Sequence, residues 1–273
     1  LGIYTLQPTN EQNIYNGIIM NNYKYLSIGS DNITTSPTFN LDASIIYKDP
    51  LSGWGVSFGG NYTIGRSTLS SRYFVDDFII SEYSDDIAEF SQWDLGSKIE
   101  KSFYDIGSKL SFSIKYNEQY SSLNQNGTPY NYRNNTLTPK LEFNGNITRW
   151  LNIIYKGQYV YNKYNIEGSY ETTQNNTLSQ EIKLAFYPHK KLEINISAEH
   201  YYNKNNAGTK QQMILADCSI WYYATKKLQF FLHAKNLLNE DKYCFTNISP
   251  LQTSHYIYNI RPLNILIGLE YRF

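Results

Sequence analysis

The sequence predicts an all-β fold, an antiparallel transmembrane β-barrel. Three observations lead there: alternating apolar and polar residues, an aromatic-rich composition, and a regular succession of short and long connectors. Of the 273 residues 16% are aromatic, and 27 are tyrosines. Rings with a polar tip are expected where one end of the side chain is apolar and the other is wet. No uncharged apolar run reaches the roughly 18 residues of a membrane-spanning helix, and the mean hydropathy is -0.50. Strands are therefore the elements expected to contact lipid.

Charge and cysteine content exclude several classes of function. The 24 Lys and Arg residues balance 24 Asp and Glu, so no basic excess favours nucleic acid. Cys218 and Cys244 are too few for a disulfide scaffold and lack metal-ligand spacing. Cys218 alternates with Ala216 and Ile220, which predicts a buried or lipid-facing thiol.

The chain starts at Leu1 without an initiator Met or a signal-like segment, so we expect either a removed signal peptide or a longer parent protein.

Period-two alternation runs along most of the chain. Residues 110–117 alternate apolar and polar side chains without interruption, which places one strand face in an apolar medium and the other in a polar one. No stretch has convincing helical spacing. The alternation predicts about twelve strands, from near Ile18 to Phe273. Further alternating segments are 41–48, 54–64, 93–103, 137–147, 151–161, 192–198, 228–234 and 265–273.

The connectors alternate between two lengths. This succession is typical of outer-membrane barrels, whose periplasmic turns are short and whose extracellular loops are long. The expected short turns are 49–53, 104–107, 148–150, 188–190 and 224–226, and the expected long loops are 70–89, 121–132, 167–174, 204–208 and 240–255.

A soluble β-sandwich would also alternate, because its inner face is a core. Strand length favours the barrel: 93–103, 137–147 and 151–161 each keep the period for about eleven residues, whereas sandwich strands centre near ~5–6. Charges of both signs occupy one face only: Lys98, Glu100, Lys115, Lys140, Glu142, Lys156, Glu181, Lys183, Glu193 and Glu199. Aromatic residues collect at both ends of the other face, as membrane-interface girdles do: Tyr47 and Trp54 at the short-turn end, and Tyr116, Tyr161 and Tyr202 at the long-loop end.

No catalytic, cofactor-binding or metal-binding residue is predicted, and we expect that the chain is not an enzyme. Residues 55–59 match the G-x-S-x-G pattern, but that motif needs a strand-to-helix turn, and here Ser57 lies inside an alternating strand. The four histidines, His189, His200, His233 and His255, show no metal-ligand spacing. We interpret His233 as a solvated residue of the barrel interior.

The segment 70–89 is acidic and carries several aromatic residues. One interpretation is a loop that binds a cation or contacts an extracellular ligand or a surface lipoprotein. The other is a solvated loop whose charges maintain solubility, and the absence of EF-hand spacing favours it.

The end of the chain carries the strongest motifs. Residues 265–273 form an apolar row of period two that ends on Phe273, which resembles the C-terminal signature of bacterial outer-membrane barrels. Residues 234–243, with Asn236-Leu237-Leu238-Asn239, resemble the penultimate strand and following loop of TonB-dependent outer-membrane receptors. Arg261-Pro262 before the final strand is similar to the last strand of that family, in its Bacteroidota branch.

This resemblance covers roughly the last forty residues, and it implies a receptor of 22 strands with a plug domain. Twelve strands without a plug imply that residues 1–273 are the C-terminal portion of the barrel. The expected function is nutrient binding and import across the bacterial outer membrane. The implied partners are outer-membrane lipid, the remaining strands and plug, and the TonB complex. The alternative is a self-contained twelve-strand porin or translocator channel, which would close on itself.

Overall fold

A computed structural model of the chain describes residues 2–8, 17–22, 25–29, 35–75, 78–168, 172–206, 208, 210–249 and 252–273. These residues are almost entirely β-structure, as the alternation predicts. The only helical element among them is a 3₁₀ turn, η1 (Tyr104–Ile106). None of the helical structure in the described ranges is long and apolar enough to cross a membrane.

The main sheet follows the chain in order, strand beside strand. Its path is β1-β4-β5-β6-β7-β8-β9-β10-β11-β12-β13-β16, and neighbours along this path are antiparallel. The strand bounds are β1 (Gly2–Pro8), β4 (Thr35–Asp49), β5 (Trp54–Val75), β6 (Phe78–Phe103), β7 (Ser108–Gln125), β8 (Thr128–Thr148), β9 (Leu151–Ile166), β10 (Thr172–His189), β11 (Leu192–Asn205), β12 (Lys210–Tyr223), β13 (Leu228–Lys235) and β16 (Asn264–Tyr271). Twelve strands on this path match the predicted number. The predicted first strand, near Ile18, is not part of this path. The path starts at β1, and β2, which begins at Ile18, lies outside it.

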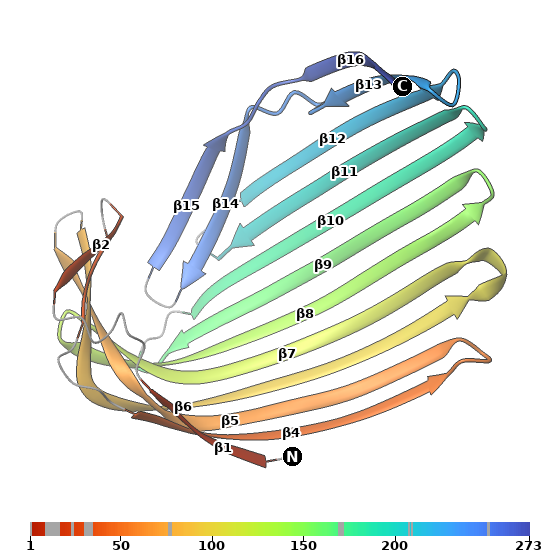
Figure 1. The fold of residues 1–273 in the computed structure, drawn as a ribbon. Helices are drawn as coiled ribbons and strands as arrows, with labels where there is room; N and C mark the ends of the chain where they lie inside the picture. Colours follow the sequence, from red (N-terminus) through yellow and green to blue (C-terminus); the bar gives the residue numbers. More distant parts are fainter. Residues whose placement is uncertain are drawn as a thin grey trace.

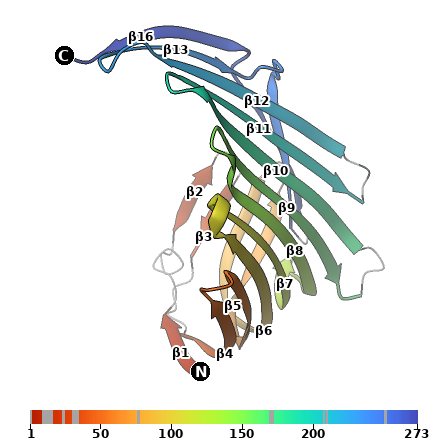
Figure 2. The ribbon, with the colours of Figure 1, turned by 90° about the vertical axis from the view of Figure 1, so that its right-hand side faces the viewer.

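The sheet is curved but does not close on itself (Figures 1 and 2). In the described part of the chain, β1 pairs only with β4, and β16 pairs only with β13. Both outer strands therefore present unpaired backbone N–H and C=O groups along one edge.

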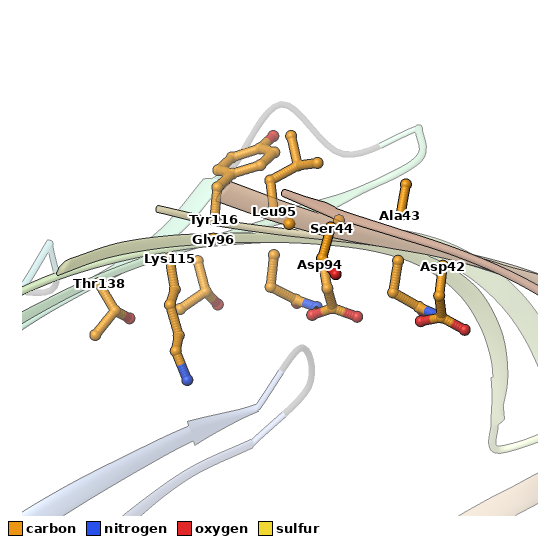
Figure 3. Close-up of a pocket in the computed structure, with 14 residues that line it drawn as sticks. Asp42, Ala43, Ser44, Asp94, Leu95, Gly96, Lys115, Tyr116 and Thr138 are labelled. Atoms are coloured by element: carbon orange, nitrogen blue, oxygen red, sulfur yellow. Dashed lines mark hydrogen bonds between the residues drawn. The ribbon is translucent and has the colours of Figure 1, made fainter. Parts of the chain in front are cut away.

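Four shorter strands lie outside this path. β2 (Ile18–Asn22) pairs with β3 (Tyr25–Ile28), and β3 runs parallel to the start of β6. β14 (Lys242–Ser249) and β15 (Gln252–Asn259) form a separate hairpin, which lies on the concave side of the sheet (pale blue, below the sheet in Figure 3). The segment 240–255, expected to be a loop, is therefore mostly strand.

The exposure of apolar residues is the reverse of that in a soluble domain. In the described residues, the buried apolar side chains are Met213 and Ala234 alone. Large apolar residues point outward instead, with Ile45 74%, Phe58 55% and Ile267 73% exposed. Because side chains alternate across a strand, these residues share the convex face, while the charged residues of the same strands occupy the concave face.

The short turns confirm the prediction at one end of the sheet. They lie at 50–53, 104–107, 149–150, 190–191 and 224–227. Aromatic residues crowd this rim: Tyr47, Trp54, Phe103, Tyr104, Trp150, Tyr187, Tyr222 and Tyr271 are all at least 40% exposed. At this rim, Lys101 Nζ lies over the Trp54 ring, 4.9 Å from its centroid.

The opposite end differs from the prediction. The acidic segment 70–89 is not a loop, because β5 continues to Val75 and β6 begins at Phe78. The physical reason is composition: between its acidic residues the segment is rich in aromatic and β-branched residues, which favour strands. Likewise, β7 continues to Gln125 and turns through Asn126 and Gly127 into β8, so the expected loop 121–132 is a tight hairpin.

Candidate functional site on the concave face

One row of polar side chains crosses eight strands at the same level of the concave face. Cross-strand pairing places its members directly opposite one another, from β4 to β11. This polar row consists of Asp42, Asn61, Asp94, Asn117, Thr136, Asn162, Asn175 and Asn205. Adjacent strands lie about 4.8 Å apart, so side chains in such a row are within hydrogen-bonding reach.

Hydrogen bonds run along the polar row. Asn61 Nδ2 donates to Asp42 Oδ1 at 2.7 Å, and Asn117 Nδ2 donates to Asp94 Oδ1 at 2.7 Å. Gln92 Nε2 donates to Asp94 Oδ2 at 2.6 Å. Both Asp94 oxygens therefore accept an amide N–H, which orients the carboxylate.

A hollow of about 970 Å³ lies along the first strands of this row. Its floor includes Gly59 and Gly96, which are directly paired across β5 and β6. Figure 3 shows Asp42, Asp94 and Lys115 on the side of the sheet that faces the β14–β15 hairpin, and Leu95 and Tyr116 on the other side. The polar side chains of the lining therefore project toward the concave side, and we call this space the glycine-floored hollow.

The two floor glycines are not required by packing. A Cβ built on Gly96 meets nothing within 4 Å. A Cβ built on Gly59 meets Ser44 Cβ and Ala43 O at 3.4 Å, which is ordinary contact. Neither residue has a positive φ. The glycines keep open a space that larger side chains would fill.

Next to the polar row lies a network of ion pairs, which we call the charge belt. It comprises Lys98, Glu100, Lys109, Lys140, Glu142, Lys156, Glu181 and Lys183. Glu100 pairs with Lys98 at 2.8 Å and with Lys109 at 3.0 Å. Glu181 pairs with Lys183 at 2.5 Å and with Lys156 at 3.7 Å. The belt confirms that these predicted charges share one face. Because the side chains of the charge belt are partly exposed, each ion pair contributes about 0–1 kcal/mol to the stability of the fold.

Lys115 lies on the same face as the charge belt but is not part of it. It is exposed and lines the glycine-floored hollow. Within the described ranges, no carboxylate lies within ion-pair distance of its ammonium. The hollow therefore combines two carboxylates held by amides with one cation that has no acidic partner.

The β14–β15 hairpin packs against the concave face through Thr246. Its side chain is buried, and its Oγ1 donates to Gln211 Oε1 at 2.9 Å and lies 2.9 Å from His255 Nδ1. The hairpin also carries a stack of rings, in which Phe245 lies 4.7 Å from Tyr256 and 6.0 Å from Tyr258 between centroids, with interplanar angles of 16°. The hairpin is thus an ordered element attached to β12.

Asn236 holds the base of this hairpin. It is 7% exposed and has φ 56°, a left-handed conformation that Asn tolerates better than most residues. Its Nδ2 donates to the carbonyl of Glu240 at 2.6 Å and to that of Arg261 at 2.9 Å. Its Oδ1 accepts the N–H of Glu240 at 2.9 Å. One amide therefore joins the chain entering the hairpin to the chain leaving it.

The residues singled out in the sequence do not converge. Ser57 lies near the start of β5, opposite Lys98. His189 ends β10 and His200 contacts Gln180, whereas His255 contacts Thr246. In the described part of the chain, no group of three His, Cys, Asp or Glu residues could hold a metal ion.

His233 is half-buried and lies on the same face as Phe231. Its ring lies 5.1 Å from that of Trp221 and 4.9 Å from that of Phe231, so it belongs to an aromatic cluster. Gly268 pairs with Phe231 across the sheet, and a Cβ on Gly268 would clash with the Phe231 ring. Cys218 is a half-buried free thiol, paired in register with Ile196 and Ala234.

Comparison with known proteins finds no matching family model and no matching curated protein. Among solved structures, the chain is similar to the ferric yersiniabactin uptake receptor FyuA from Yersinia pestis, at 13% identity and a TM-score of 0.42 over 89% of this chain and 43% of that one. It is similar to BauA, the ferric preacinetobactin receptor from Acinetobacter baumannii, at 9% identity and a TM-score of 0.39 over 87% and 45%. It is also similar to OmpT, an outer membrane protein of Vibrio cholerae, at 11% identity and a TM-score of 0.35 over 99% and 95%. The chain thus spans less than half the length of FyuA and BauA.

Proposed function

We propose that the chain forms the C-terminal part of the barrel wall of a TonB-dependent receptor, which imports a nutrient across the bacterial outer membrane. The observation that carries this proposal is the inverted exposure of the sheet. A convex face of exposed Ile, Leu, Phe and Val opposite a concave face of ion pairs suits a wall with lipid on one side and water on the other. The aromatic rim at the short-turn end supports placement of the strands across a bilayer.

The two open edges support a larger barrel. Unsatisfied backbone groups cost several kcal/mol each in hydrocarbon, so membrane sheets close. A self-contained twelve-strand porin or translocator would require β1 to pair with β16, and in the described residues these strands pair elsewhere. Further strands of the same receptor would complete the wall, and a plug domain would occupy its interior.

The resemblance of residues 234–243 and 260–273 to TonB-dependent receptors supports the specific class. In this chain Asn236 and Asn239 both adopt positive φ and end β13, and the closing strand β16 follows Pro262. The wall itself performs no covalent chemistry in this proposal. Its concave face provides a hydrated passage, and the TonB complex supplies the energy through the plug.

Nutrient uptake by cells that express the native-length protein tests this function. Uptake should be saturable and should be lost when TonB is deleted, while the protein remains in the outer-membrane fraction. Uptake that continues without TonB would indicate that the protein is a passive channel and not a TonB-dependent receptor. Recovery of the protein outside the outer membrane would overturn the proposal as a whole.

A further inference from the structure

We propose that three successive short turns, those between β8 and β13, bind the headgroup of an anionic phospholipid in the periplasmic leaflet. This inference rests on the proposed function only in that the strands cross an outer membrane, with their short turns on the periplasmic side. The contacts come from five exposed basic side chains, which we call the basic rim: Arg149, Lys190, Lys191, Lys226 and Lys227.

The basic rim carries cations without acidic partners. None of its three turns contains Asp or Glu: 148–151, 188–192 and 223–228. In the described ranges, no carboxylate lies within ion-pair distance of any of the five cations. The other two short turns are mixed, since Asp49 follows Lys48 in one and Asp105 lies in the other. The uncompensated positive charge is therefore confined to one part of the short-turn end.

Two carboxylates lie in the hollow beside these turns, but both bond elsewhere. The Tyr223 hydroxyl donates to Glu193 Oε2 at 3.0 Å, and Glu270 pairs with Arg272 at 3.0 Å. The cations of the basic rim are thus left for a partner from outside the chain.

Backbone and side-chain bonds join two of the turns. Lys191 Nζ donates to the carbonyl of Ala224 at 3.0 Å, and the N–H of Tyr223 donates to the carbonyl of Lys191 at 2.9 Å. The turns are two strands apart, or about 10 Å. Four of the five cations therefore belong to one ordered patch.

The rings beside the basic rim place it at the depth of lipid headgroups. Trp150 directly follows Arg149, and Tyr271 pairs with Leu228, the neighbour of Lys227. These two rings are 47% and 51% exposed, and interfacial Trp and Tyr mark the headgroup level. The headgroup layer is roughly 5–8 Å deep on each side of the hydrocarbon core, and a strand advances about 3.3 Å per residue. The basic side chains therefore lie within that layer.

Charge complementarity selects the kind of lipid. Each Lys or Arg near an anionic membrane surface strengthens binding by about fivefold. A zwitterionic headgroup offers the same phosphate beside a compensating cation, so it gains less from the basic rim. An acidic protein segment would have the right charge, but the turns are short and hold the cations beside the interfacial rings. Lipid is the partner that occupies this position.

Mass spectrometry of the intact native-length protein with its bound lipids tests the inference. The protein in detergent is given equal amounts of phosphatidylglycerol, cardiolipin and phosphatidylcholine. At least one anionic lipid should be retained about fivefold more than phosphatidylcholine. Lys226→Gln combined with Lys227→Gln should reduce this preference by about fivefold or more, because two cations of the patch are lost. Arg149→Gln combined with Lys190→Gln provides a second pair in the other two turns, should the first pair fail to fold.

The matched control is Lys48→Gln combined with Lys109→Gln, which removes two exposed lysines from the other part of the short-turn end. It should leave the lipid preference unchanged. Inorganic phosphate should displace no more lipid than chloride does at equal ionic strength, and polyglutamate should bind the wild type and the rim variants alike. The inference is wrong if the three lipids are retained equally or if rim and control pairs have equal effects. Specific displacement by phosphate, or polyglutamate binding that the rim substitutions abolish, would also overturn it.

Lipid preference and TonB-dependent uptake are separate measurements on the same protein. A lost lipid preference with intact uptake would reject the basic rim and leave the receptor in place. An intact lipid preference with uptake that needs no TonB would reject the receptor and leave the basic rim in place.

Discussion

The backbone N–H of Asn236 donates to the Asp217 carboxylate at 2.8 Å, and this bond attaches the base of the β14–β15 hairpin to β12. The remaining polar atoms of Asn236 bond the two chains of the hairpin base. The hairpin is therefore fixed at its base by one buried side chain and over the sheet by Thr246.

Asn236→Ala should release the hairpin. It removes three side-chain hydrogen bonds at a buried position, each worth about 1 kcal/mol, and it places alanine in a left-handed conformation. We expect a loss of about 2–4 kcal/mol of local stability, measured by hydrogen exchange of residues 242–249. Asn236→Gly keeps the backbone conformation accessible and should lose less. Equal protection in wild type and Asn236→Ala would show that the hairpin is held elsewhere.

Ile45→Arg should destabilise the inserted protein by about 1–2 kcal/mol, because arginine on a lipid-facing position costs up to about 2–4 kcal/mol at the midplane and less toward the interface. Ile46 is the matched control, since it is also an exposed isoleucine but lies on the concave face. Ile46→Arg should lower the free energy of unfolding by much less than Ile45→Arg. The measurement is denaturant unfolding in lipid vesicles, and equal costs at the two sites would contradict the assignment of faces.

Asp49 should titrate below the ordinary range of an aspartate. The Ser52 hydroxyl donates to Asp49 Oδ2 at 2.5 Å and the Leu51 N–H donates to Oδ1 at 3.0 Å, and these bonds lower the pKa of Asp49 from its usual value of 3.8. A lowered folded-state pKa means that the turn gains stability above the unfolded pKa and loses it as pH falls through the folded one. Ser52→Ala should raise the pKa of Asp49, observed by NMR of its carboxyl carbon. The control is Ser113→Ala in β7, away from this turn, which should leave the pKa of Asp49 unchanged.

Glu181→Gln tests the charge belt. It removes the carboxylate shared by Lys156 and Lys183. Because the pair is partly exposed, we expect a loss of about 1 kcal/mol or less at low salt, measured by denaturant unfolding. The difference from wild type should shrink in about 1 M salt, where the Debye length is about 3 Å. A difference that is independent of salt would mean that Glu181 acts through packing.

The sequence pattern predicted face alternation and the short turns well, because both are local. Period two is visible in 110–117 without knowledge of any partner strand, and Gly53 and Gly107 mark turns by their need for positive φ. The expected long loops were less accurate. In 70–89 the acidic residues suggested solvent exposure, whereas strand propensity and cross-strand pairing extended β5 and β6.

The hollow could not be predicted because it depends on register. Gly59 and Gly96 are 37 positions apart in the chain, and nothing in the sequence places one opposite the other. The polar row likewise depends on the registers of seven neighbouring strand pairs. The one available signal was the recurrence of Asn and Asp at polar-face positions, which composition alone explains in an Asn-rich chain.

Met213 and Ala234 are the buried apolar side chains of the described residues. This part of the chain therefore has almost no hydrophobic core to drive its folding in water. In our proposal the solvent that drives folding is the acyl chain region of the bilayer, and insertion and folding become one event. Such a chain in aqueous transit would expose its convex face to every other apolar surface nearby. It would therefore depend on a holding chaperone until strand pairing and lipid contact form together.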